Sequence, residues 1–539
     1  MKKELKNPQV DPLPAHQEAQ NRRLVRSTLS MTLPTVLSRI LGYFRDMFQA
    51  KFLGTGKGMD AYIIASLIPN LLRRLTAEGA MTAAFIPVFA QEKKDKSRDE
   101  LWTFANAFFF DLTLILTVLT VLGIVFAPIL VKVFAFGYGR VQGKWELTII
   151  LTKIMFPYIF LISLAALAMA ILNSFRKFFV PAFTPVLFNL AIIMAAVFFA
   201  ENAREPAYVF AVGVILGGLL QLGIQIPFLR RQGMTFKFGI SFTHPAVKKV
   251  ARLMIPGIFG AGIYQINMLI SRMIATSLEE GSVSSLYYAS RIEELTLGLF
   301  AIALSIALFP TLSDLAARKD IEGMKKTLKY SFKLIFLVTF PAMAGLIVLN
   351  KPIIQVLFQR GAFDAQSTAL SSWCLLFFAF GLPFISGTKI LAPMFFSLKD
   401  TKTPVIVAFF VMISYIGFSL FLMGPLRAGG IALALSLSSL INFVALFILL
   451  EKKIGRIEKK DLLVSALKSA LSAVVMAGAV WFFIDQFDFE KLEFIEMSSV
   501  VLAAILGGGI IYLIMNLLFK HEDLKGLKQV FSKEKILRD

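Results

Sequence analysis

The stretch LWTFANAFFFDLTLILTVLTVLGIVFAPILVKVF (101–134) decides the fold class of this chain. Only Asp111 and Lys132 in it are charged, and it is longer than the ~20 apolar residues with which an α-helix crosses a bilayer. Similar runs recur from Met31 to Phe519, and 57% of the 539 residues are apolar. Because helices satisfy their own backbone hydrogen bonds in lipid, the sequence predicts an all-α polytopic membrane protein.

Runs of this kind predict about fourteen transmembrane helices. They cover residues 30–50, 59–90, 101–134, 147–173, 180–200, 207–229, 253–277, 284–314, 331–350, 367–396, 403–424, 429–450, 462–484 and 497–519. The connectors between them are short, so the chain has no room for a soluble catalytic domain.

Every second connector is basic, and so are both termini. Examples are Lys93, Lys94, Lys96 and Arg98, then Arg230, Arg231, Lys237, Lys248, Lys249 and Arg252, then Lys452, Lys453, Arg456, Lys459 and Lys460. In a soluble protein the net charge of +21 would suggest a nucleic-acid partner. Here the positive-inside rule explains it. We expect no nucleic acid, and we expect both termini in the cytoplasm of a bacterial inner-membrane protein.

The proline positions indicate an internal repeat. Pro34, Pro87, Pro157 and Pro185 are matched in the same order by Pro256, Pro310, Pro383 and Pro404, at offsets of 222, 223, 226 and 219 residues. Each offset spans six predicted helices, an even number, so the two copies cross the membrane in the same direction. We expect parallel six-helix lobes, residues 30–230 and 253–450, around a central cavity. Residues 462–519 are two extra helices, and residues 1–29 and 520–539 are cytoplasmic ends.

The sequence lacks the usual marks of an enzyme or a metalloprotein. No segment matches the G-x-x-x-x-G-K-[ST] motif of P-loop ATPases. The single cysteine, Cys374, excludes disulfides within the chain and a cysteine-rich metal site. The histidines fall in predicted cytoplasmic segments. We therefore expect a protein that is not an enzyme and that binds no metal or cofactor.

Charged residues inside apolar spans are the strongest functional signal. Each costs ~2.5–3.5 kcal/mol at the centre of a membrane helix, so such residues usually face a cavity or a partner. The predicted spans carry Arg39, Arg45, Asp46, Asp60, Arg73, Arg74, Glu78, Lys153, Arg272, Arg291, Glu293, Glu294, Lys389 and Lys468. Arginine predominates, and its planar guanidinium binds phosphate with two hydrogen bonds. This pattern predicts an anionic substrate that carries phosphate.

The competing interpretation is that these cations form structural ion pairs with the carboxylates in the same spans. We favour the structural interpretation for Arg74, Arg272, Lys153, Lys389 and Lys468. For Arg45, Arg73 and Arg291 we favour substrate binding.

Three stretches resemble the signature of a known family. They are SRILGYFRD (38–46), MDAYIIASLIPNLLRRLTAEGAMTAAFIPVFA (59–90) and GSVSSLYYASRIEELTLGLFAIALSIALFPTLS (281–313). The family is MurJ/MviN, the lipid II flippases of the multidrug/oligosaccharidyl-lipid/polysaccharide exporter superfamily. The resemblance begins at about residue 28 and covers the rest of the chain. It implies a V-shaped pair of lobes that moves lipid II, the undecaprenyl-pyrophosphate-linked peptidoglycan precursor, to the periplasmic leaflet by alternating access during cell wall biogenesis.

The resemblance also assigns roles to residues. It implies substrate binding by Arg39, Arg45, Arg73, Ser284 and Arg291, and a supporting charge network of Asp46, Asp60 and Glu78. It implies that residues 462–519 form a groove for the lipid tail.

Energy source and partners follow from the same resemblance. Some family members bind sodium with acidic residues of the seventh and later helices, but here the seventh helix offers Gln265 and Asn267 and no carboxylate. We therefore expect the membrane potential, rather than sodium, to drive transport. The expected partners are lipid II and membrane lipids, and the expected state is a monomer near the cell-wall synthesis machinery.

Other functions remain open on the sequence. A flippase for another polyprenyl-pyrophosphate-linked oligosaccharide would need the same arginines. A multidrug exporter is disfavoured because its cationic substrates would be repelled by them. A membrane glycosyltransferase is disfavoured by the short loops, and a scaffold for envelope assembly would leave the charges within the membrane without a purpose.

Overall fold

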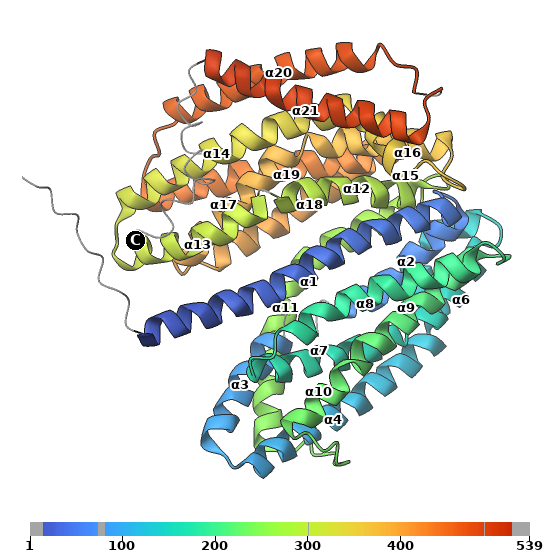
Figure 1. Ribbon diagram of the computed structural model, residues 1–539, viewed down its shortest axis with the longest axis vertical. Coiled ribbons are helices and arrows are strands. Elements are labelled where there is room, and N and C mark those ends of the chain that lie inside the picture. The colour runs from blue at the N-terminus through green and yellow to red at the C-terminus, as the bar shows by residue number, and fades with distance from the viewer. Residues whose placement is uncertain (1–14, 74–80, 300, 490, 520–539) are drawn as a thin grey trace, which may run out of the picture.

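The computed structural model describes residues 15–73, 81–299, 301–489 and 491–519 (Figure 1). These residues form helices joined by short turns, with no β-strand among them. The first half contains α1 (Ala15–Leu53), α2 (Lys57–Arg73), α3 (Thr82–Asp95), α4 (Arg98–Val125), α5 (Ala127–Phe134), η2 (Phe136–Arg140), α6 (Lys144–Met155), α7 (Tyr158–Ser174), α8 (Phe179–Ala195), η3 (Ala196–Ala200), α9 (Pro206–Gly223) and α10 (Gln225–Gln232).

The second half contains α11 (Pro245–Ala275), α12 (Ser282–Leu299), α13 (Ala301–Ala317), α14 (Ile321–Val348), α15 (Asn350–Phe358), α16 (Ala365–Ala379), α17 (Leu382–Ser397), α18 (Lys402–Leu426) and α19 (Ala428–Ile454). Two more helices, α20 (Lys460–Ile484) and α21 (Phe494–Leu518), end the described chain. The prediction of an all-α membrane protein is confirmed by this arrangement and by the apolar length of its helices.

Each of the fourteen predicted stretches coincides with one helix or with consecutive helices. Within the described ranges, nine helices or continuous helix pairs are long and apolar enough to cross a membrane, and the pair α16–α17, bent by 48°, makes a tenth. The other predicted spans, 30–50, 59–90, 253–277 and 284–314, carry most of the charged residues discussed above, which lower their hydropathy. The number of fourteen stays a prediction.

The first helix is longer than its predicted span. The sequence predicts a helix over 30–50, whereas α1 runs over 39 residues from Ala15 to Leu53. At 1.5 Å per residue it is about 58 Å long, roughly twice the thickness of a bilayer core. The sequence before residue 30 lacks glycine and proline from Ala15 onward, so nothing stops the helix at the edge of the apolar run.

The second half repeats the element order of the first. The helix α2 packs on α6 as α12 packs on α16, and α8 packs on α9 as α18 packs on α19. The proline pairs follow the same correspondence, since Pro34 and Pro256 lie in α1 and α11, and Pro185 and Pro404 lie in α8 and α18. Figure 1 shows the halves as two groups of helices, with α11 crossing between them. The residue bounds of the lobes stay predictions.

The last two helices lie outside this repeat. They pack on each other, and α20 packs along α14 of the second half. Their shared core includes Leu337, Met476 and Tyr512, and the Tyr512 hydroxyl donates to the Leu337 carbonyl at 2.7 Å. The outward sides of α20 and α21 expose large apolar side chains such as Leu506, as expected for helices that face lipid.

Candidate functional site

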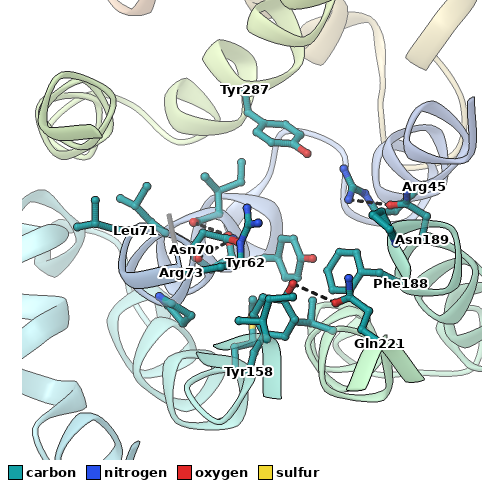
Figure 2. A pocket seen from close by; sticks show the side chains of 18 of the residues that line it. Arg45, Tyr62, Asn70, Leu71, Arg73, Tyr158, Phe188, Asn189, Gln221 and Tyr287 are labelled. Carbon is teal, nitrogen blue, oxygen red and sulfur yellow. Dashed lines mark hydrogen bonds between the residues drawn. The ribbon is translucent and has the colours of Figure 1, made fainter. Parts of the chain in front are cut away.

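A cavity of about 420 Å³ lies between the two halves (Figure 2). Its wall comes from α1, α2, α6, α7, α8 and α9 of the first half and from α11 and α12 of the second. The charged residues that line it are Arg45, Arg73, Arg272, Arg291 and Glu294, and the polar ones are Gln49, Tyr62, Ser66, Asn70, Tyr158, Thr184, Asn189, Gln221, Tyr287 and Ser290. The volume falls within the ~300–1,000 Å³ typical of ligand pockets.

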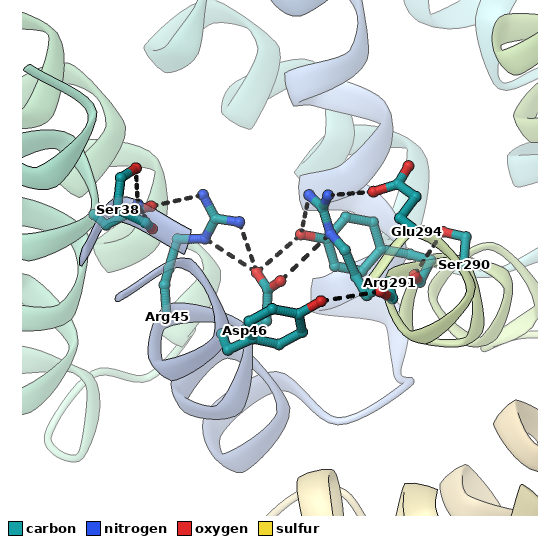
Figure 3. A network of polar contacts seen from close by, with 9 residues as sticks. Ser38, Arg45, Asp46, Ser290, Arg291 and Glu294 are labelled. Carbon is teal, nitrogen blue, oxygen red and sulfur yellow. Dashed lines mark hydrogen bonds and ion pairs between the residues drawn. The ribbon is translucent and has the colours of Figure 1, made fainter. Parts of the chain in front are cut away.

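A buried carboxylate joins two of the cavity arginines (Figure 3). The Oδ1 atom of Asp46 accepts from Nε and Nη2 of Arg45 at 3.0 and 2.7 Å, and its Oδ2 lies 3.4 Å from Nε of Arg291. The Tyr287 hydroxyl also donates to Asp46, at 3.0 Å, and Arg45 donates from Nη1 to Asn189 Oδ1 at 3.0 Å. This network connects α1 of the first half to α12 of the second.

Two guanidinium groups converge on one aromatic ring. The Arg272 and Arg291 guanidinium carbons lie 5.3 and 4.7 Å from the Tyr287 ring centre, which is cation–π distance. Arg291 also donates to Glu294 Oε2 at 3.0 Å and to the Tyr287 hydroxyl at 3.0 Å. By contrast, Arg272 has no carboxylate within ion-pair distance among the described side chains, and its buried Nη1 has no hydrogen-bond partner there.

The cavity is therefore cationic. Among the described side chains that line it are four arginines and one carboxylate, Glu294, and the buried Asp46 pairs with Arg45 and Arg291 from outside the lining. This leaves an excess of two positive charges, which arginine keeps at any physiological pH. A site of this charge attracts an anion and repels a cation.

The remaining predicted residues lie elsewhere. Arg73 lines the cavity from the end of α2, and its Nε donates to Asn70 Oδ1 at 3.3 Å. Arg39 does not line the cavity; its side chain is exposed, and its Nη1 approaches Gly298 of α12. Glu78 and Arg74 lie outside the described residues.

Asp60 and Ser284 do not line the cavity; they meet where α2 and α12 begin. The Oδ1 atom of Asp60 accepts from the backbone N–H and the hydroxyl of Ser284 at 2.8 and 2.7 Å. Its Oδ2 accepts from the Gly281 N–H at 3.0 Å and pairs with Lys144 Nζ at 2.6 Å. A carboxylate of the first half thus caps the N-terminus of α12 in the second half, where unpaired N–H groups favour an anion.

Around Asp60 the two halves touch through their backbones. The Ala362 N–H donates to the Lys51 carbonyl at 2.7 Å, and any side chain on Gly54 would clash with the Ala362 carbonyl. A Cβ on Gly281, whose φ is +89°, would lie 2.6 Å from the Thr55 carbonyl oxygen. We call these contacts, together with the Asp60 cap, the seal.

The buried pair in the seal gives a stability prediction. Asp60→Ala leaves the Lys144 ammonium buried without its carboxylate, and breaking such a pair costs ~3–5 kcal/mol. We expect a clear fall in the thermal unfolding midpoint of the purified protein in detergent. The double variant Asp60→Ala/Lys144→Met should recover much of the loss, because it removes the unpaired charge. A single variant as stable as wild type would contradict this account.

Four residues of these networks are not among the site residues that the sequence predicts. The sequence favours a structural role for Arg272, Lys144 lies just before a predicted span, and Asn189 and Tyr287 are uncharged residues in α8 and α12. The signal available for Arg272 was its position within an apolar span. No group of three or more His, Cys, Asp or Glu side chains that could hold a metal occurs in the described ranges.

Comparisons with known proteins point to one family. A sequence profile of the family described as Lipid II flippase MurJ matches residues 49–503. The chain is 34% identical over 520 residues to the probable lipid II flippase MurJ of Vibrio cholerae, covering 94% of this chain and 98% of that protein. It is 36% identical over 435 residues to the lipid II flippase MurJ of Burkholderia cenocepacia, covering 80% and 84%.

Solved structures give the same result. A lipid II flippase MurJ in an inward closed conformation superposes with a TM-score of 0.75 at 29% identity, covering 91% of this chain and 99% of that one. An inward-facing multidrug transporter of the MATE family superposes with a TM-score of 0.65 at 14% identity, covering 79% and 98%. The second likeness concerns the fold alone.

Proposed function

The chain belongs to the MurJ family of lipid II flippases, and we propose that it moves lipid II from the cytoplasmic to the periplasmic leaflet of the bacterial inner membrane by alternating access. The observation that carries the mechanism is the cationic cavity between the halves, which are joined to each other at the seal. Lipid II presents a pyrophosphate, the group that a set of arginines binds best.

The geometry supports an order of binding events. Arg272 lacks a carboxylate partner among the described residues, so it offers the pyrophosphate a guanidinium at no cost in broken ion pairs. Arg45 and Arg291 are held by Asp46, and phosphate oxygens would compete with that carboxylate for their donors. Arg45 and Arg291 belong to different halves. If phosphate replaces Asp46 as their partner, the affinity for the substrate depends on how the two halves are arranged. A ligand can shift a conformational equilibrium only through such a difference in affinity.

Sidedness follows from the basic connectors. With both termini in the cytoplasm, the seal faces the periplasm and the cavity receives lipid II from the inner leaflet. The tail of the lipid would run along α20 and α21, which lie outside the repeated halves and expose apolar side chains.

The driving force and the working state complete the proposal. A cavity with excess positive charge does electrical work when it moves within the membrane field. We propose that the membrane potential drives transport without sodium, a cofactor or chemical catalysis, and that a monomer works beside the cell-wall synthesis machinery.

Translocation in reconstituted vesicles tests the function. The purified chain is placed in liposomes that contain lipid II, and the fraction of lipid II exposed on the outer surface is followed with time. Faster equilibration than in protein-free liposomes is expected. In cells, depletion of the protein should cause lipid II to accumulate in the inner leaflet. Accumulation of a different polyprenyl-pyrophosphate oligosaccharide, with no effect on lipid II, would overturn the substrate assignment.

The role of Arg272 gives a separate prediction. Charge-assisted hydrogen bonds contribute ~1.5–3 kcal/mol each, so Arg272→Gln should weaken lipid II binding roughly tenfold or more. The thermal stability of the variant should stay near that of wild type. Arg318→Gln, which changes an exposed arginine outside the cavity, is the control. Unchanged binding with reduced stability would restore the structural interpretation of Arg272.

A further inference from the structure

One wall of the cavity is lined mainly by aromatic and amide side chains, apart from Arg73 at the end of α2. It is formed by α2, α7, α8 and α9, all within the first half, and includes Tyr62, Tyr158, Thr184, Phe188 and Gln221. Figure 2 shows the rings of Tyr62, Tyr158 and Phe188 gathered next to the Gln221 amide, with Arg45 beside them and Tyr287 across the cavity. The Tyr158 and Phe188 ring centres are 5.4 Å apart.

Gln221 is the polar centre of this wall. Its side chain is buried, with 5% of its surface exposed, yet it lines the cavity. Its Oε1 accepts from the Tyr158 hydroxyl at 3.4 Å, and its backbone carbonyl accepts from Gln225 Nε2 at 3.0 Å. Among the described residues, the Gln221 Nε2 has no acceptor, so its N–H groups remain available to a ligand in the cavity.

We propose that this wall, defined by Tyr158, Phe188 and Gln221, is a sugar subsite that binds an N-acetylated hexose unit of the substrate. The inference rests on the proposed function and specifies which part of the head group this wall recognises. A hexose has apolar C–H faces, which pack on aromatic rings, and hydroxyl and acetamido oxygens at its edge, which accept from an amide N–H.

The alternatives fit this wall less well. A phosphate would gain more at the arginines, which lie on α1, α11 and α12 and at the end of α2. The carboxylates of a peptide would also be drawn to those cations. A purely apolar ligand would leave the Gln221 amide without a partner, which buried polar groups avoid. An uncharged, hydroxyl-rich group satisfies both the rings and the amide.

The test compares two ligands with the full-length chain in nanodiscs. The first ligand is lipid II, and the second is undecaprenyl pyrophosphate, which has the same tail and pyrophosphate but no sugar. We expect Gln221→Leu to weaken lipid II binding about tenfold, the effect of losing roughly one good hydrogen bond to a ligand, and to leave undecaprenyl pyrophosphate binding unchanged. Arg272→Gln should weaken the binding of both ligands.

A neighbouring residue provides the matched control. Gln225 lies one helical turn further on, is equally buried and bonds the backbone carbonyls of Ala165 and Gln221, but does not line the cavity. Gln225→Leu should keep the wild-type ratio of the two affinities. If Gln221→Leu does not fold, Gln221→Asn retracts the amide while keeping its chemistry, and the same selective loss is expected.

The outcomes separate the two proposals. Equal weakening of both ligands by Gln221→Leu, or no weakening of either, would overturn the sugar subsite. Wild-type affinities that do not differ between the two ligands would overturn it as well and leave pyrophosphate recognition standing. A wild-type chain that binds neither ligand would overturn the proposed function itself.

Discussion

A disulfide between the cysteines of Thr55→Cys and Ser367→Cys is expected to stop lipid II transport completely, and reduction is expected to restore it. The two hydroxyl oxygens lie 2.9 Å apart across the seal, and both side chains are buried. A disulfide needs Cβ atoms ~3.5–4.5 Å apart, and two side chains whose γ oxygens are in hydrogen-bond contact are close enough to test as a cysteine pair. Alternating access requires the seal to open, so a covalent bond across it holds the cavity shut on that side.

The native thiol is removed first by Cys374→Ala. Cys374 is buried in the apolar core, where alanine is tolerated better than a hydroxyl without a partner. Each single cysteine variant serves as a control and should transport normally under oxidising and reducing conditions. Transport is measured in reconstituted vesicles with and without dithiothreitol. A fully crosslinked protein that still transports lipid II at the wild-type rate refutes opening at the seal.

The second large effect is expected at the charge network. Arg45→Ala and Arg291→Ala each remove a guanidinium that lines the cavity and leave Asp46 with one cation fewer. Loss of the substrate hydrogen bonds costs ~1.5–3 kcal/mol per charged bond, or about 10–150-fold in affinity. We also expect Arg73→Ala to fail. None of the three should complement a strain depleted of its flippase, although immunoblots should show near-normal protein levels.

Charge-preserving variants refine this prediction. Arg291→Lys keeps the positive charge but loses the planar fork that bonds Asp46, Glu294 and Tyr287 together. It should complement partially, whereas Arg318→Ala, at an exposed ion pair outside the cavity, should complement fully. Full growth with all three alanine variants would mean that the cavity arginines do not bind the substrate.

The helices themselves were predictable because apolar runs of membrane-spanning length have few alternatives in lipid. The cationic nature of the cavity was also predictable, because charged side chains in membrane-spanning helices usually face a polar cavity or an ion-pair partner. Arg45, Arg73 and Arg291 do line one cavity. Their roles in binding stay predictions.

Helical periodicity did not predict that Ser284 and Arg291 would reach different sites. Seven residues apart, they share one side of α12, but that spacing also separates them by about 10 Å along the axis. One therefore contacts Asp60 in the seal while the other lines the cavity. The pairing of Asp60 with Lys144, 84 residues later, depends on how α2 packs on α6, which no local pattern encodes.

The seal bears on whether ions can leak through the protein. In the proposed orientation it lies on the periplasmic side of the protein, where it joins the two halves, and the proton gradient is maintained across this membrane. A barrier made of long side chains would leave gaps through which hydrated ions leak. Here the backbone at Gly54 and Gly281 lies directly against the opposing carbonyls of Ala362 and Thr55. Such backbone-to-backbone contacts leave little room for a hydrated ion to pass between the halves at this point.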